Sequence, residues 1–114
     1  MAFVMKAGDT KRLNITLRDK KTGQPYDLTF AQIRWWASRG DTGKFSRTPA
    51  IQKSLGNGIE EISALDGQCL VTIQPADTRE LAGVYYHEVE ITDAYGNVAT
   101  PIADTFTIEK DLIR

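Results

Sequence analysis

The sequence predicts an all-β protein, an antiparallel sandwich of about seven to eight strands with one short helical turn. Segments in which apolar and polar residues alternate recur along the chain, as they do in strands with one buried face. Turns rich in glycine, proline and aspartate separate these segments at short intervals. With 114 residues the chain is long enough for one hydrophobic core. We therefore expect a single domain over residues 1–114.

Four strands are expected in the first half of the chain, at residues 2–5, 11–18, 33–38 and 49–55. The second is the most regular, because its apolar residues alternate with polar ones. Pro49 suggests that the fourth strand lies at a sheet edge, since proline cannot donate to a ladder. Residues 39–48 are polar and contain two glycines. We predict that they form a loop or a mobile hairpin tip.

Four more strands are expected at residues 59–63, 68–74, 84–91 and 98–109. The last is interrupted by Pro101, which predicts a bulge or bend. The residues expected to point into the core are Leu13, Ile15, Leu17, Ile33, Trp35, Val71, Ile73, Leu81, Tyr85, Val89, Ile91, Phe106 and Ile108.

A corner motif lies between the strand expected at residues 68–74 and the strand expected at residues 84–91. Asp77 and Glu80 have the spacing of a capping box at the start of a short helix. Gly83 then allows a sharp bend, and Tyr85 enters a long strand. This pattern is typical of the corner before strand F of an immunoglobulin-like sandwich. It predicts that the Tyr85 hydroxyl bonds to the backbone of residues 77–81.

Composition excludes several classes of protein. The net charge of −1 gives no electrostatic footprint for nucleic acid. The single cysteine, Cys69, excludes an internal disulfide. The first nine residues are too weakly apolar for a secretion signal, and no run is long enough to span a membrane. We therefore expect folding in the cytoplasm.

The residue types that support chemistry are scattered. His87, the only histidine, is expected to be a buried, hydrogen-bonded residue, and Cys69 a small buried hydrophobic residue. Glu88 and Glu90 share an outward strand face, but such a face offers no cleft for glycoside hydrolysis. We expect no catalytic residues, no metal site and no cofactor, and hence no enzyme.

Three segments together resemble a known group of proteins. They are the residues KAGDT leading into RLNITL, the run from Gly67 to Gly83 that includes DT and LAG, and YYHEVEITD followed by TFTI near the end. This order resembles small immunoglobulin-like structural proteins of tailed bacteriophages and prophages. It also resembles the amino-terminal domain of phage baseplate upper proteins.

The resemblance implies a virion structural protein, a tail, baseplate or neck component that acts as a non-catalytic adaptor. It would form a homo-oligomer and bind other virion structural proteins, and it would bind neither nucleic acid nor membrane. It would lie in the host cytoplasm during assembly and then in the virion. An alternative is a carbohydrate- or ligand-binding β-sandwich module that uses exposed aromatic residues; a small enzyme is a third.

One surface stands out as a candidate interface. In an immunoglobulin-like sandwich strands C and F are neighbours, here residues 33–38 and 84–91. If Trp35 lies opposite His87, then Trp36 lies opposite Tyr86 and Arg34 opposite Glu88, all on the outer face. Trp, Tyr and Arg dominate binding hot spots. We therefore predict that Arg34, Trp36, Tyr86 and Glu88 belong to an interface; the alternative is that the aromatic pair and the ion pair only stabilise the sheet.

Overall fold

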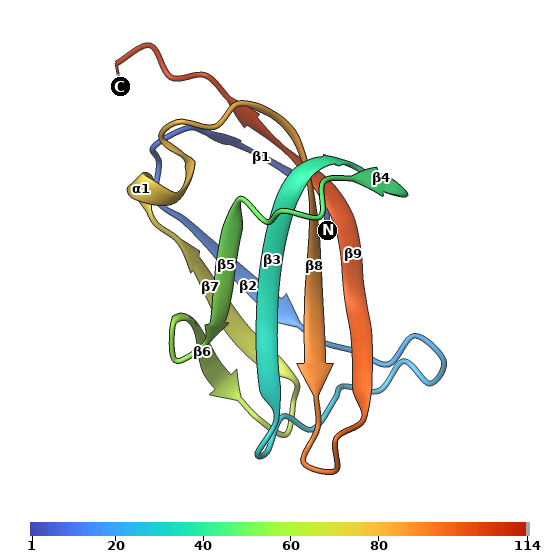
Figure 1. The fold of residues 1–114 in the computed structure, drawn as a ribbon. Helices are drawn as coiled ribbons and strands as arrows, with labels where there is room; N and C mark the ends of the chain where they lie inside the picture. The colour runs from blue at the N-terminus through green and yellow to red at the C-terminus, as the bar shows by residue number, and fades with distance from the viewer. Residues whose placement is uncertain (114) are drawn as a thin grey trace.

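The computed structural model describes residues 1–113 and contains nine strands and one short helix (Figure 1). Strands make up 57% of the chain and helix 4%, so the prediction of an all-β protein is confirmed. The elements are β1 Phe3–Lys6, β2 Lys11–Thr16, β3 Gln32–Asp41, β4 Lys44–Phe45, β5 Ile51–Leu55, β6 Gly58–Ser63, β7 Gln68–Ile73, α1 Pro75–Thr78, β8 Gly83–Thr92 and β9 Val98–Glu109.

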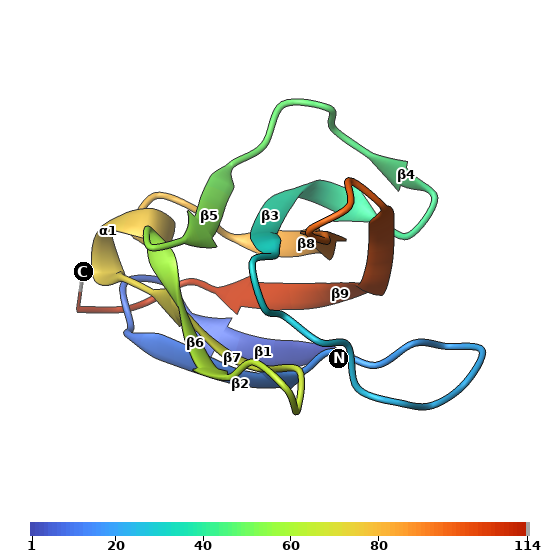
Figure 2. The same ribbon diagram turned by 90° about the horizontal axis from the view of Figure 1, so that it is seen from below.

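All nine strands belong to one sheet, which is nearly closed into a barrel. Its order is β1-β9-β8-β3-β5-β6-β7-β2, and β4 pairs with β3 beside this path. Seen from one end, the sheet curls round so that β3 and β8 lie on one side and β2, β6 and β7 on the other (Figure 2). The core fills the space between these two sides.

Two pairs of strands are parallel, so the expectation of a fully antiparallel arrangement was wrong there. β1 runs parallel to β9, and β5 runs parallel to β6. The expected edge position of β5 was also wrong, because β5 lies between β3 and β6. Pro49 precedes the strand, which begins at Ile51, and so removes no donor from its ladder.

The predicted core is confirmed for every residue named except Leu81, which is partly buried and packs against the core from the corner. Burial of these side chains follows from the alternation, because one face of each strand points inward. Trp35, Tyr85 and Phe106 are the largest of the fully buried side chains. The predicted irregularity at Pro101 is also present, since the β8–β9 register shifts between Val89 and Ile91, opposite this segment.

The helical turn begins earlier than the capping pattern indicated. Pro75 occupies the first turn, where its missing N–H costs nothing. Asp77 is the third helical residue, and its carboxylate accepts a hydrogen bond from the Gln74 backbone N–H at 2.7 Å. The Asp77–Glu80 capping box was therefore wrong. The turn is tied to the β1–β2 connection by Thr78, whose Oγ1 accepts from the Gly8 N–H at 2.9 Å.

Tyr85 is 1% exposed, as predicted, but its hydroxyl has a different partner. It accepts a hydrogen bond from the Arg39 guanidinium at 2.8 Å, and the same guanidinium donates to the Ala82 carbonyl at 3.2 Å. The predicted bond to the backbone of residues 77–81 was therefore wrong. The long β3 strand brings Arg39 to the corner, where its side chain connects the tyrosine to the backbone beside Gly83.

Residues 39–48 contain a hairpin, one of the two predicted alternatives. β3 continues to Asp41, turns at Gly43 and returns as β4, with Gly40 opposite Phe45. The two strands approach so closely at Gly40 that a Cβ there would lie 2.5 Å from the Phe45 Cα. Glycine at residue 40 therefore permits the hairpin to fold back along the end of β3.

Candidate interaction surface

Alternation along β3 and β8 places the predicted interface residues on the outer face of the sheet. Arg34 and Trp36 come from β3, and Tyr86 and Glu88 from β8, whereas Trp35 and His87 point inward and are fully buried. The structure therefore brings all four candidates onto one face, as predicted.

The register between the two strands differs from the predicted one by two residues. Trp36 lies opposite Glu88, and Arg34 lies opposite Glu90. The predicted pairs Trp36–Tyr86 and Arg34–Glu88 were wrong. Because the shift is an even number of residues, every side chain keeps its predicted face. Arg34 forms its ion pair with Glu90 instead of Glu88, and its guanidinium lies 5.7 Å from the Trp36 ring centroid.

The β4 hairpin adds an aromatic residue to this face that the sequence reasoning missed. The Phe45 ring stacks on Tyr86, with centroids 4.2 Å apart and planes 15° from parallel. This contact leaves Tyr86 only 7% exposed, while Trp36 and Phe45 are each 41% exposed. Phe45 is the one large apolar residue within residues 39–48, and that was the available signal.

Together these side chains form what we call the outer patch: Arg34, Trp36, Phe45, Arg47, Tyr86, Glu88 and Glu90. At its β4 end is a shallow hollow of about 150 Å³, lined by residues that include Trp36, Phe45, Arg47, Pro49 and Tyr86. A second hollow is lined by Arg34, Trp36, Glu88 and Glu90. The patch thus combines exposed aromatic side chains with charged groups, residue types that occur together in binding surfaces. Glu88 lies opposite Trp36 in the middle, Arg34 and Glu90 lie at one end, and Arg47 lies at the other.

A hydrogen bond within the outer patch fixes the position of one of its carboxylates. The Tyr86 hydroxyl donates a hydrogen bond to the Glu88 carboxylate. Burial raises the pKa of Tyr86 to about 12, helped by this hydrogen bond and by the charge of Glu88. The phenol therefore stays protonated at neutral pH and holds one carboxylate in place beside Trp36.

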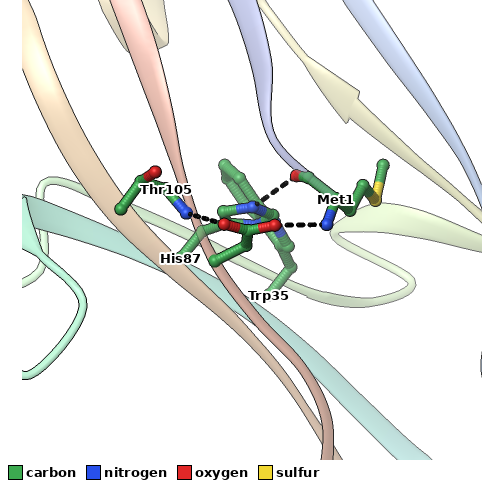
Figure 3. Close-up of polar contacts among 5 residues, drawn as sticks. Met1, Trp35, His87 and Thr105 are labelled. Atoms are coloured by element: carbon green, nitrogen blue, oxygen red, sulfur yellow. Dashed lines mark hydrogen bonds and ion pairs between the residues drawn. The ribbon is translucent and has the colours of Figure 1, made fainter.

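Beneath the patch, on the inner side of the sheet, a buried polar cluster surrounds His87 (Figure 3). His87 Nδ1 accepts a hydrogen bond from Trp35 Nε1 at 2.9 Å, and Nε2 lies 3.0 Å from the Met1 carbonyl oxygen. A neutral ring with its proton on Nε2 satisfies both contacts. The prediction of a buried, hydrogen-bonded histidine is confirmed.

The same cluster continues to the surface of the barrel through Asp104, which lies opposite His87 on β9. Its carboxylate pairs with the Met1 ammonium at 2.5 Å and accepts from the Thr105 N–H at 2.7 Å. Burial lowers the pKa of His87 below its ordinary value, although the Met1 carbonyl and Asp104 oppose that shift. The hydrogen bond from the Met1 ammonium lowers the pKa of Asp104. The cluster therefore anchors the segment that leads into β1.

The remaining sequence candidates lie apart from this face. Cys69 is fully buried, and burial raises the pKa of its thiol to about 11, so the prediction of a buried small residue is confirmed. Glu60 and Glu61 are both exposed on β6. Within residues 1–113, no group of three or more His, Cys, Asp or Glu side chains is arranged to hold a metal ion.

No helix among the described residues has both the length and the apolar character needed to cross a membrane. Comparison with known proteins found no matching family model and no matching curated protein.

Proposed function

We propose that this protein is a structural component of a bacteriophage or prophage virion, a tail, baseplate or neck protein that acts as a non-catalytic adaptor. The observation that carries the proposal is the outer patch. It leaves two large aromatic side chains, Trp36 and Phe45, each 41% exposed on a sheet face beside charged groups that are already positioned. Small monomeric proteins rarely expose such a surface, whereas assembly subunits cover it with a neighbour.

We further propose that the nearly closed sheet is an immunoglobulin-like sandwich. The order β2-β7-β6 corresponds to strands B, E and D of that fold, and β3-β8-β9 to strands C, F and G. In this correspondence β5 joins the two halves on one side, and β1 lies against β9 on the other. The resemblance to immunoglobulin-like virion proteins is in agreement with this arrangement.

In this role the chain needs neither a cofactor nor catalysis. Its partners are other virion structural proteins, including copies of itself. It is present in the host cytoplasm during assembly and afterwards in the virion.

Mass spectrometry of purified particles tests the proposal. Particles are collected from the source organism after prophage induction, banded on a density gradient and digested with trypsin. We expect peptides of this chain to rise and fall across the gradient with those of the tail. Absence of the chain from particle fractions, while it is abundant in the lysate, would contradict the proposal.

A carbohydrate-binding module is the second candidate, favoured by the hollow that Trp36, Phe45 and Tyr86 line. Aromatic faces of this kind suit the apolar face of a sugar ring. A glycan array separates the two. Saturable binding to a glycan that Trp36→Ala abolishes supports the module, whereas an assembly protein retains no sugar.

A further inference from the structure

We propose that the outer patch pairs with the outer patch of a second copy of this chain, across a two-fold axis that lies between the two faces and crosses the strands. The inference rests on the proposed function only in taking the patch as an assembly surface. It adds the identity of one partner and the arrangement of the pair.

The charged side chains of the outer patch lie at different positions along the strands. The β4 hairpin lies beside the end of β3, at the top of the view in Figure 1, and Phe45 of this hairpin stacks on Tyr86 of β8, which lies opposite Ser38 of β3. Arg47 lines the hollow at this end. Arg34 and Glu90 lie at the opposite end, about four residues or 13 Å further along the strands. Each end of the patch therefore has its own charge pattern, with Trp36 and Glu88 between the two ends.

The cation at the β4 end has no partner within the described chain. Arg47 is exposed, and none of the described carboxylates lies within ion-pair distance of it. At the other end, Glu90 is bound by Arg34 through one oxygen. A carboxylate has two oxygens and room for further donors. Glu90 can therefore accept a second guanidinium supplied from outside.

A two-fold axis across the strands satisfies both ends at once. It reverses the strand direction, so the β4 end of each copy faces the Arg34–Glu90 end of the other. Arg47 of one copy then approaches Glu90 of the other, and the symmetry repeats this contact. The exposed Trp36 side chains, which lie midway between the two ends, are brought together in the centre, and Phe45 of each copy faces the Arg34–Glu90 end of the other. An axis parallel to the strands would instead place Arg47 against Arg47, which charge repulsion disfavours.

The two-fold symmetry makes a mixing experiment decisive. In Arg47→Glu, both contacts of the pair bring two carboxylates together. In Glu90→Lys, both contacts bring two cations together. When the two variants are mixed, one contact of the mixed pair joins the two substituted side chains, whose charges are exchanged but still opposite. The other contact is an unaltered Arg47–Glu90 pair, so both contacts are attractive.

Sedimentation equilibrium measures the result. We expect the parent chain, of 12.7 kDa, to form a dimer whose dissociation constant rises with ionic strength. Each single variant should weaken the dimer roughly a hundredfold, about tenfold for each altered contact, and the mixture should restore association. Lys20→Glu and Glu60→Lys make comparable charge reversals at exposed positions outside the patch and should leave the dimer intact.

Three results would overturn the inference, provided that circular dichroism shows each variant to be folded. The parent could remain a monomer at high concentration, the single variants could dimerise like the parent, or the mixture could fail to associate. If the chain is monomeric but present in purified particles, the proposed function stands and only the self-pairing is wrong. If it dimerises as expected but is absent from particles, the self-pairing stands and the proposed function is wrong.

Discussion

At the scale of single residues, His87 is held neutral by its surroundings. Its Nδ1 accepts from Trp35, so a proton added there would face another donor. The charged groups nearest to it oppose each other, because the Met1 ammonium disfavours the imidazolium and Asp104 favours it. Burial is the largest effect and lowers the pKa of the folded state below 6.5.

This gives a prediction for the pH dependence of stability. The unfolded histidine takes up a proton near its ordinary pKa, before the folded one does. The contribution of neutral His87 is therefore complete above about pH 6.5 and is lost as the pH falls below that value. Urea unfolding between about pH 7 and pH 5 should show stability falling by up to about 1.4 kcal/mol per pH unit.

His87→Gln is the control for this prediction, because its amide offers one acceptor and one donor but does not titrate. The free energy of unfolding of this variant should change less with pH over that interval, whatever its value at pH 7. Asp104 acts in a lower window, since its lowered pKa adds stability above about pH 3.8 that is lost below it. An unchanged slope in His87→Gln would contradict the assignment.

Tyr85→Phe gives a second prediction at this scale. It removes the acceptor that Arg39 uses while preserving the buried ring. We expect the free energy of unfolding to fall by about 1 kcal/mol, the net value of one hydrogen bond. Tyr95→Phe is the matched control, because Tyr95 is 92% exposed and should be neutral. Equal unfolding midpoints for the two variants in urea would show that the Arg39 bond contributes nothing.

At this scale the sequence predicts which way a side chain points but not what it touches. Alternation alone places Trp36 and Tyr86 outward and Tyr85 and His87 inward. The partner of Tyr85 could not be predicted, because Arg39 lies 46 residues away in the sequence. It also belongs to a strand, β3, that was expected to end before it. Long-range contacts of this kind have no local signature.

At the scale of elements, the alternation of apolar and polar residues does not determine the register between neighbouring strands. A shift of two residues between β3 and β8 preserves both faces, so the hydrophobic pattern cannot distinguish the two registers. The β4 strand was missed for a related reason. Its two residues carry no periodicity, and the anchoring contact of Phe45 is made to another strand.

Phe45→Ala gives a prediction for this hairpin. Phe45 is the aromatic side chain that fixes β4 to the sheet face, through its stacking on Tyr86. Without it, we expect backbone amides of residues 40–48 to exchange hydrogen at least tenfold faster, while those at the centre of β8 stay protected. Hydrogen–deuterium exchange measures both. Lys44→Ala is the control, since its side chain is exposed.

The mobility of residues 39–48 stays a prediction. In the parent chain we expect the turn at residues 41–44 to exchange faster than the Phe45 amide. Uniform protection across the whole segment in the monomeric protein would contradict it.

At the scale of the whole molecule, the all-β class follows from periodicity and turns, but the closing of the sheet does not. β5 pairs with both β3 and β6, and its parallel pairing with β6 follows only from the path of the chain. β1 is four residues long, too short for a periodic signal that would indicate its partner. The outer face of Arg34, Trp36, Tyr86 and Glu88 was predicted from the sequence, whereas the β4 strand that covers one end of this face was not.

The central claim is that the outer patch is an assembly surface, and incorporation of a patch variant into particles tests it most directly. Trp36→Ala removes an exposed aromatic side chain from the centre of the patch, and Tyr95→Ala removes one from the distant β8–β9 turn. Each variant replaces the parent gene, and the chain is quantified in purified particles by mass spectrometry. We predict at least a tenfold loss of incorporation for Trp36→Ala and none for Tyr95→Ala, with both proteins folded. Equal incorporation of Trp36→Ala and the parent would contradict the claim.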